Sequence, residues 1–110
     1  MTSSETSKEV ESYLLNKSAK KGDWNKVNEI CEENKHFLSE QDMGLWIRSK
    51  FMIKDYQGCY DLCLKIIPKK RSLLKEKCRF MLRSSIKLAN RDIIEKSINY
   101  YEKIFPDNQV

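Results

Sequence analysis

The sequence predicts an all-α protein whose roughly six helices pair as three antiparallel hairpins, at about residues 6–36, 39–67 and 72–105. The 110 residues contain only three glycines and two prolines, which leaves little room for the turns of a β-sandwich. Capping residues precede the apolar segments, and the loops between these segments are too short for anything but antiparallel neighbours. With 40% hydrophobic and 34% charged residues, the chain is expected to fold as a single domain over residues 1–110.

The first hairpin is predicted from two sets of capping residues. Thr6 and Glu9 can form a capping box, so the first helix is expected to run from there to about residue 20. Its predicted apolar side consists of Val10, Tyr13, Leu14, the stem of Lys17 and Ala19. Asp23 can cap a second helix over about 24–33. The buried side of that helix is expected to contain Val27, Ile30 and Cys31.

The second hairpin begins at Ser39, which with Asp42 three residues later predicts the start of a helix running to about residue 54. Its apolar residues are Met43, Trp46, Ile47, Phe51 and Met52. Asp55 is expected to cap a fourth helix that stops before Pro68. The residues predicted to face inward are Tyr56, Cys59, Tyr60, Cys63, Ile66 and Ile67. Gly58 lies inside this helix, either at a cost of about 1 kcal/mol relative to Ala or because the preceding helix packs tightly there.

The third hairpin is predicted to contain the longest helix. Ser72 is expected to cap a fifth helix over residues 73–89. Its core side is predicted to consist of Leu74, Cys78, Met81, Leu82, Ser85 and Leu88. A short turn over 90–92 then leads to a sixth helix over 93–105, which Pro106 closes.

The turns between paired helices repeat along the chain. Gly22-Asp23-Trp24 and Lys54-Asp55-Tyr56 are the same turn at positions 32 residues apart, and residues 91–97 form a looser third copy. A period of roughly 30–40 residues with two helices per unit is typical of an α-solenoid.

The chain resembles three tetratricopeptide-type repeats over nearly its whole length. The segments KDYQGCYDLCLKIIP and RDIIEKSINYYEKIFPDN are similar to the second helix and terminal proline of such a repeat. The repeats are degenerate, because Ile47 and Ser85 stand where the family usually has glycine or alanine, and the first hairpin ends at His36-Phe37 without a proline. The resemblance implies a short right-handed α-solenoid, and other classes of helical repeat remain open.

The resemblance also implies a non-catalytic binding module with a groove lined by the first helix of each pair. In the chaperone-binding branch of the family, this groove holds the terminal carboxylate of a peptide with lysine, asparagine and arginine side chains. Arg79 and Arg83 fall on the two basic positions of the third repeat, and Asn16 falls on the asparagine of the first. Ser12 and Leu45 replace the other two residues. Three matches of five are too few to predict chaperone binding.

A row of basic residues four positions apart, and so about one helical turn apart, is the main candidate for function. The row consists of Arg71, Lys75, Arg79, Arg83, Lys87 and Arg91. Like charges at this spacing repel by roughly 0.2–0.5 kcal/mol per pair in an isolated helix, so an acidic group should face them. Residues 46–110 hold fifteen Lys and Arg against seven Asp and Glu, a net charge of +8, whereas residues 1–45 hold six against nine, a net charge of −3.

We therefore predict a basic face that binds an acidic or helical segment of another protein, because guanidinium groups bind carboxylates bidentately. The residues predicted to form it are Asn16, Arg48, Lys75, Arg79, Arg83 and Lys87. The alternative is that these side chains are solvated or pair internally with Glu29, Glu32 or Glu76.

Nucleic acid is the competing partner, since a pI of about 9.0 and a basic helix favour it. Three observations place it below a protein partner. The first half of the chain is acidic, no helix-turn-helix or RNA-binding motif appears, and no aromatic residues alternate with the basic row as stacking platforms.

The sequence predicts no enzyme, no cofactor and no metal site. His36, the single histidine, has no acid or nucleophile at a suitable spacing, and no glycine-rich phosphate loop occurs. The four cysteines are interpreted as buried, reduced thiols. A metal site would need Cys31 and His36 beside Cys59 and Cys63, and the usual Cys-x-x-Cys pairs are missing.

The last predicted helix carries apolar residues where a solenoid needs a polar cap. If no further helix covers them, these residues form a docking surface for a partner, a second copy of the chain or a larger assembly. They are Tyr100, Tyr101, Ile104 and Phe105. No apolar run is long enough for a membrane span, and the N-terminus resembles neither a secretory signal nor a transit peptide. We therefore expect an intracellular protein of the cytoplasm or nucleus.

Overall fold

A computed structural model describes residues 3–106, and this part of the chain is all-α. It contains six helices and no strand, as the sequence predicts. The helices are α1 (Ser3–Lys20), α2 (Trp24–Glu33), α3 (Glu40–Met52), α4 (Tyr56–Lys65), α5 (Arg71–Leu88) and α6 (Arg91–Ile104). No helix within the described residues is long and apolar enough to cross a membrane.

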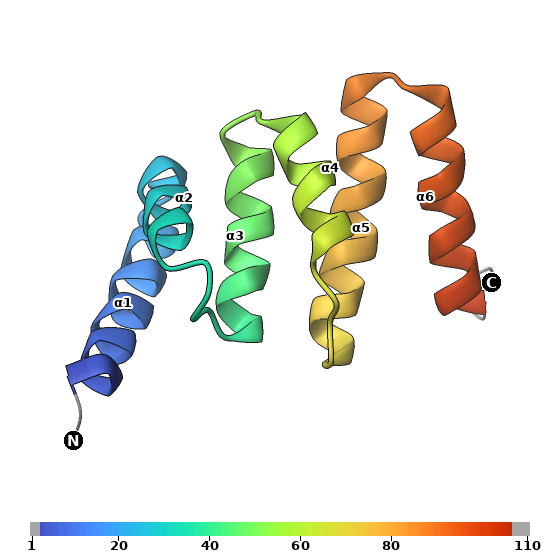
Figure 1. The fold of residues 1–110 in the computed structure, drawn as a ribbon. Coiled ribbons are helices and arrows are strands. Elements are labelled where there is room, and N and C mark those ends of the chain that lie inside the picture. Colours follow the sequence, from blue (N-terminus) through green and yellow to red (C-terminus); the bar gives the residue numbers. More distant parts are fainter. Residues whose placement is uncertain (1–2, 107–110) are drawn as a thin grey trace.

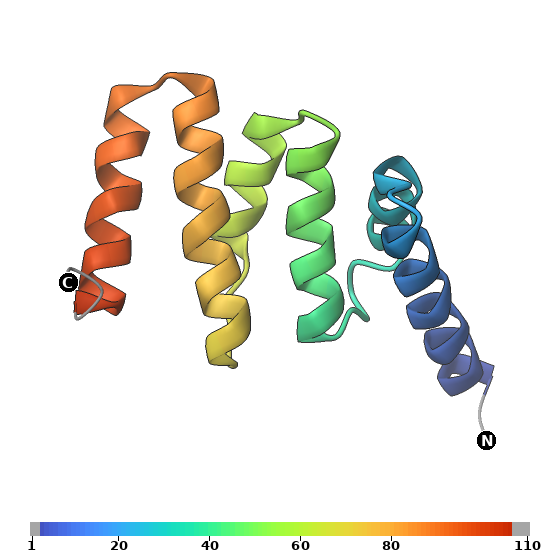
Figure 2. The same ribbon diagram turned by 180° about the vertical axis from the view of Figure 1, so that it is seen from behind.

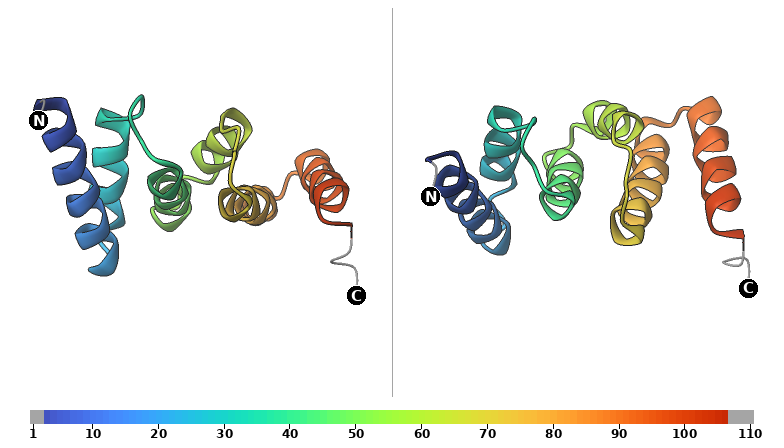
Figure 3. Two further views of the ribbon diagram at one scale, coloured as in Figure 1. Left: turned by 90° about the horizontal axis from the view of Figure 1, so that it is seen from below. Right: turned by 60° about the horizontal axis from the view of Figure 1, so that its bottom comes forward.

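Consecutive helices run in opposite directions and follow one another along the long axis of the molecule (Figure 1). The principal extents are 47 × 26 × 22 Å, with α1 and α6 at opposite ends. The views from behind and from below show the same order (Figures 2 and 3). Helix α3 contacts α1 and α5 in addition to its neighbours along the chain. Helices α3 and α5 therefore lie side by side and build a common face.

Three predicted helix caps are confirmed. The side chain of Asp23 accepts a hydrogen bond from the backbone N–H of Lys26, at the start of α2. Ser39 and Asp55 accept in the same way at the starts of α3 and α4. These bonds satisfy donors that a helix start otherwise leaves without a partner. All three caps are local, spanning three residues of sequence.

Two predicted helix starts are wrong. Helix α1 begins at Ser3, so Thr6 lies inside the helix and does not cap it. Helix α5 begins at Arg71, which places Ser72 in the first turn rather than at the cap. The N-cap position belongs to Lys70, whose side chain makes no capping bond. Its role is taken by Glu40 of α3, whose carboxylate accepts from the backbone N–H of Lys69 at 2.7 Å and of Lys70 at 2.8 Å.

Helix α1 buries a different side from the one predicted. Leu15 is fully buried in the core, whereas Val10, Tyr13 and Leu14 are exposed, Tyr13 at 65% of its surface. Among the described residues α1 contacts α2 and α3 alone, so a helix at the end of the molecule needs only a narrow buried stripe. The apolar residues of α1 therefore cover a wider part of its surface than its two neighbours bury.

The core is centred on α3, α4 and α5. Leu73 and Phe80 are buried on α5, although neither belongs to its predicted core side. Met52 and Ile67 are exposed instead of buried, and Ile67 shows 85% of its surface because α4 ends two residues earlier. The absence of a side chain at Gly58 leaves room for the capping carboxylate of Asp55, which an added Cβ would strike. The atoms nearest to Gly58 therefore belong to its own helix cap.

Candidate functional site

Three arginines from two helices converge on the face built by α3 and α5. Arg48 extends from α3, and its Nη2 lies 3.4 Å from Oε2 of Glu76 on α5. Nη1 of Arg79 lies 3.3 Å from the other oxygen, Oε1, of the same carboxylate. Arg83 follows one helical turn after Arg79. We call Arg48, Arg79 and Arg83 the arginine cluster.

The ring of Phe80 lies close to two members of the arginine cluster. The guanidinium carbon of Arg83 lies 5.6 Å from the centre of its ring, and that of Arg48 lies 5.9 Å away. Both distances are within the range of a cation–π interaction. The ring itself is buried and packs against Phe51 with the ring centres 5.4 Å apart. Two of the three guanidinium groups are thus placed over a rigid aromatic residue of the core.

The positive charge of this face is only partly neutralised. Glu76 is shared between Arg48 and Arg79, and exposed ion pairs of this kind contribute roughly 0–1 kcal/mol. The predicted internal pairing with Glu76 is therefore present, but for two of the basic residues only. Arg83, Lys75 and Lys87 are exposed and form no ion pair with any described residue. The face keeps an excess of positive charge.

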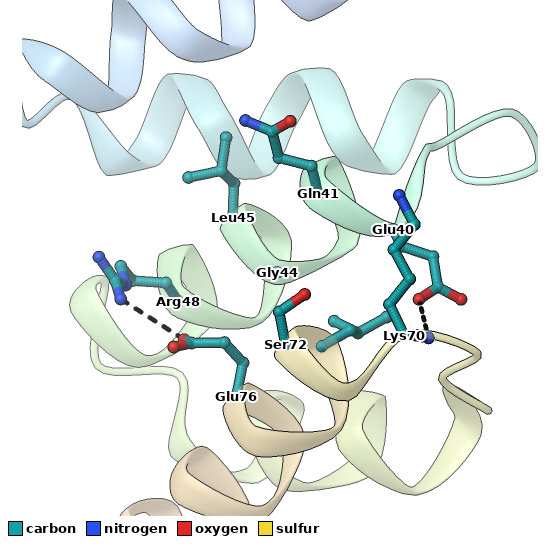
Figure 4. Close-up of a pocket in the computed structure, with 9 residues that line it drawn as sticks. Glu40, Gln41, Gly44, Leu45, Arg48, Lys70, Ser72 and Glu76 are labelled. Atoms are coloured by element: carbon teal, nitrogen blue, oxygen red, sulfur yellow. Dashed lines mark hydrogen bonds and ion pairs between the residues drawn. The ribbon is translucent and has the colours of Figure 1, made fainter.

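A cleft of about 390 Å³ lies beside the arginine cluster, between α3 and α5 (Figure 4). Its walls are formed by Glu40, Gln41, Gly44, Leu45, Arg48, Lys70, Ser72, Leu73 and Glu76. Gly44 leaves the space open, and a Cβ added there would only reach ordinary contact with Leu73, at 3.9 Å. The ion pair of Arg48 and Glu76 borders the cleft on one side. Glu40 borders it on the opposite side, beside the start of α5. The cleft is therefore lined by both apolar and charged side chains.

Comparisons with known proteins give this chain no relative. No family model, no curated protein and no solved structure matches it. The site is therefore interpreted from its own geometry.

Asn16 is not part of the arginine cluster. Its Nδ2 donates to the backbone oxygen of Ser12 within α1, and α1 makes no contact with α5 in the described part of the chain. The hydroxyl of Ser12 in turn donates to the buried carboxylate of Asp42 at 2.8 Å. Of the two positions where the tetratricopeptide resemblance implies ligand contacts, Ser12 thus joins α1 to α3 and Asn16 bonds within α1. Lys87 lies near the C-terminal end of α5, two helical turns from Arg79.

The expected docking surface on α6 is smaller than predicted. Phe105 is only 4% exposed, and the guanidinium carbon of Arg71 lies 4.8 Å above its ring centre. The ring of Tyr101 lies 5.5 Å from that of Phe105. Tyr100, Tyr101 and Ile104 are partly exposed. Phe105 must therefore be removed from the predicted surface, because Arg71 of the basic row and Tyr101 cover it.

Lys77 is a buried lysine that the sequence analysis missed. It is 7% exposed, and its Nζ donates to the backbone oxygen of Ile66 at 2.8 Å, at the C-terminal end of α4. The same ammonium lies 5.1 Å from the ring centre of Tyr100. A cation is favourable at the negative end of a helix dipole. Lys77 therefore joins α4, α5 and α6 and has no part in the exposed basic face.

All four cysteines are buried and free, and burial raises the pKa of three of them, whereas a hydrogen bond with Cys63 lowers the pKa of Cys59. Burial, together with the nearby charges of Asp42 and Glu32, raises the pKa of Cys31 to about 12. A hydrogen bond to Cys59 and burial raise the pKa of Cys63. Thiols in this state are poor nucleophiles, because the thiolate is the reactive form. No group of three or more His, Cys, Asp or Glu residues is placed to hold a metal within residues 3–106.

Proposed function

We propose that this chain is a non-catalytic interaction module that binds an acidic segment of a partner protein on the face built by α3 and α5. The supporting observation is the arginine cluster, in which Arg48 and Arg79 share the single carboxylate of Glu76 and Arg83 has no acidic partner among the described residues. Carboxylates of a partner can pair with Arg83 directly and can replace Glu76 at the other two. Aliphatic side chains of the partner can enter the neighbouring cleft.

We also propose that the three hairpins form a short tetratricopeptide-like solenoid. The support is the order of contacts, in which each helix packs on the next and α3 additionally contacts α1 and α5. In this arrangement the first helices of the hairpins line one face. The arginine cluster, from α3 and α5, lies on that face.

A binding measurement tests the proposed site. The probe is a fluorescein-labelled peptide of glutamate, aspartate and glycine, titrated with the whole chain and followed by fluorescence anisotropy. We expect saturable binding that weakens at least about tenfold in the variant Arg79→Glu with Arg83→Glu. Both side chains are exposed, so the helical circular dichroism should not change. Unaltered binding by this variant would exclude the arginine cluster as the site.

Two lysines of α6 provide a matched control. Lys96 and Lys103 are exposed and form no ion pair within the described residues. The variant Lys96→Glu with Lys103→Glu changes the net charge by the same amount as the first variant. It should bind the acidic peptide nearly as well as the wild-type chain, since charge far from the site is screened by salt. Equal losses in both variants would show that net charge alone attracts the peptide.

Nucleic acid remains the alternative ligand for the same face. The support for it is charge alone, because Phe80 is buried and presents no ring on which a base could stack. Binding to unrelated DNA duplexes should then fall steeply with added salt. Tighter binding to duplexes than to the acidic peptide at equal salt would favour this alternative.

We place the module inside the cell, in the cytoplasm or nucleus. All four cysteines are buried and free, although Cys59 and Cys63 lie one helical turn apart. Unpaired thiols are typical of reducing compartments.

A further inference from the structure

We propose that a second hollow, between the α2–α3 loop and the end of α4, binds a short segment of another protein in which aliphatic side chains lie next to carboxylates. This site is separate from the arginine cluster and does not depend on it.

The wall of the hollow is apolar and open. Its volume is about 570 Å³, within the range of sites that hold small ligands or a few side chains. The apolar residues that line it are Leu38, Met43, Trp46, Leu62, Ile66 and Ile67. Ile67 is 85% exposed, directly before Pro68, where the chain can no longer continue the helix. An isoleucine so exposed at the edge of an apolar hollow gains burial when a segment lies across it.

The rim of the hollow is basic. Lys35, Lys65 and Lys69 line it and form no ion pair with any described residue. The one acidic residue in the lining is Glu40, whose carboxylate already accepts two backbone N–H groups. Hydrogen bonds from Lys69 and Lys70 lower the pKa of Glu40, so it stays ionised without neutralising the lysines. This charge selects an acidic occupant over a neutral or basic one.

Trp46 provides a further observation. It lines this hollow and also an adjacent one of about 410 Å³, which lies toward Lys50 and Gly58. Its indole N–H is buried and has no hydrogen-bond partner among the described residues. A buried donor without a partner is unfavourable. A small rotation of the ring between the two hollows would bring this donor to a carbonyl oxygen of the bound segment.

The experiment selects peptides on a chain in which the arginine cluster is disrupted. A phage-displayed library of random peptides is selected on the whole chain carrying Arg79→Glu and Arg83→Glu, which removes ligands of the first site. We expect the enriched peptides to place leucine, isoleucine, methionine or phenylalanine beside aspartate or glutamate. Failure of the first proposal does not affect this result, because two of the three arginines of that site are replaced by glutamate throughout.

Tryptophan fluorescence then locates the bound peptide. The chain has two tryptophans, so Trp24→Phe leaves Trp46 as the single reporter. Each enriched peptide should change the Trp46 emission in a saturable manner. Its Kd should rise at least about tenfold in Ile67→Asp and in Lys65→Glu with Lys69→Glu. Leu64→Asp is the matched control, because Leu64, in the last turn of α4 and three residues before Ile67, is exposed and lines neither hollow.

Three results would overturn this proposal. The selection yields no acidic and aliphatic peptides, or the peptides bind without changing the Trp46 emission, or Ile67→Asp binds them as well as Leu64→Asp does. A fourth result would assign the hollow to a second copy of the chain. In that case light scattering would give a dimer for the wild-type chain and a monomer for Ile67→Asp. The exposed Val10, Tyr13 and Leu14 of α1, next to Glu9, would then be the occupant to examine.

Discussion

Two charged side chains, Asp42 and Lys77, are buried, and each forms a hydrogen bond to a residue outside its own helix. Asp42 is 5% exposed and accepts from the hydroxyl of Ser12, which joins α3 to α1. Lys77 donates to the last turn of α4. A buried charge that loses its partner destabilises a protein more than an exposed one does. Single substitutions at these contacts should therefore affect the whole fold.

The substitution Ser12→Ala should lower the free energy of unfolding by about 1–3 kcal/mol, since it leaves the Asp42 carboxylate without this donor. Urea unfolding followed by circular dichroism measures the change. Ser18→Ala on the same helix is the control. No hydrogen bond is recorded for the Ser18 hydroxyl in the described part of the chain, so its effect should stay within about 0.5 kcal/mol. Equal stabilities of the two variants would argue against the Ser12–Asp42 contact.

Lys77→Met should also destabilise the chain, by about 1–3 kcal/mol, because it removes the donor that caps Ile66 O at the end of α4. Thermal unfolding should show a Tm lower by several degrees, at roughly 4–8 °C per kcal/mol for a domain of this size. Lys75→Met, two residues earlier on α5, is the matched control. Lys75 is exposed and forms no ion pair with any described residue, so the Tm of that variant should hardly change.

The four thiols should resist alkylation in the folded chain. Raised pKa values keep Cys31 and Cys63 protonated at about pH 8, near the pKa of an ordinary thiol. Treatment with iodoacetamide followed by mass spectrometry should find little modification of the native chain and four modified cysteines after unfolding in guanidinium chloride. Rapid modification of the native chain would contradict the observed burial.

The residues that sequence reasoning placed correctly act over short distances along the chain. Asp23, Ser39 and Asp55 cap helices three residues away, so their pattern is readable from a few letters. Phe80 was missed because charged residues of α5 surround it in the sequence. The core side predicted for α5 therefore did not include it. Lys77 was missed because a lysine is rarely buried. All three members of the arginine cluster belong to the predicted basic face, whereas Asn16, predicted with them, lies on α1 and away from the cluster.

Among the elements, the start of α5 is the one that another helix determines. Glu40, the first residue of α3, caps it through the N–H groups of Lys69 and Lys70. This contact links the starts of two helices that lie about thirty residues apart in the sequence, beyond the range over which capping patterns are read. The prediction of a Ser72 cap failed for that reason. The wrong prediction of the buried side of α1 has a related cause. The apolar pattern of a helix does not tell how many other helices pack against it.

Glu40→Gln should loosen the start of α5. Hydrogen bonds from Lys69 and Lys70 lower the pKa of Glu40, so its contribution is present above the ordinary carboxyl pKa and is lost as the pH falls through the lowered value. Amide hydrogen exchange at residues 69–72 should be faster in the variant than in the wild-type chain at neutral pH. The wild-type chain should lose this protection on acidification. Glu33→Gln, an exposed residue at the end of α2, should leave the exchange at 69–72 unchanged.

At the scale of the whole molecule, the helices form a row in which the ends have the fewest neighbours. Within the described residues, the backbone of α6 lies next to that of α5 alone, whereas the backbone of α3 lies next to four other helices. Local opening needs less free energy where fewer buried contacts are broken. The stability of the fold should therefore decrease from the centre toward both ends.

Native-state hydrogen exchange should reveal this gradient. The slowest amides are expected in α3, α4 and α5, and faster exchange in α1 and α6. Peptic fragments analysed by mass spectrometry resolve each helix. Uniform exchange across all six helices would mean that the chain unfolds only as one unit, contrary to the behaviour expected of a row of stacked elements.

The shared carboxylate of Glu76 has a consequence for the strength of binding. A ligand with one carboxylate that approaches Arg48 or Arg79 must displace Glu76, so it exchanges one ion pair for another and gains little. A ligand with several closely spaced carboxylates can in addition engage Arg83 and Lys75, which have no internal acid to displace. Glu76 therefore acts as a built-in competitor. If the proposed function is correct, affinity should rise more than linearly with the number of acidic residues in the bound segment, and sparsely charged segments should be excluded.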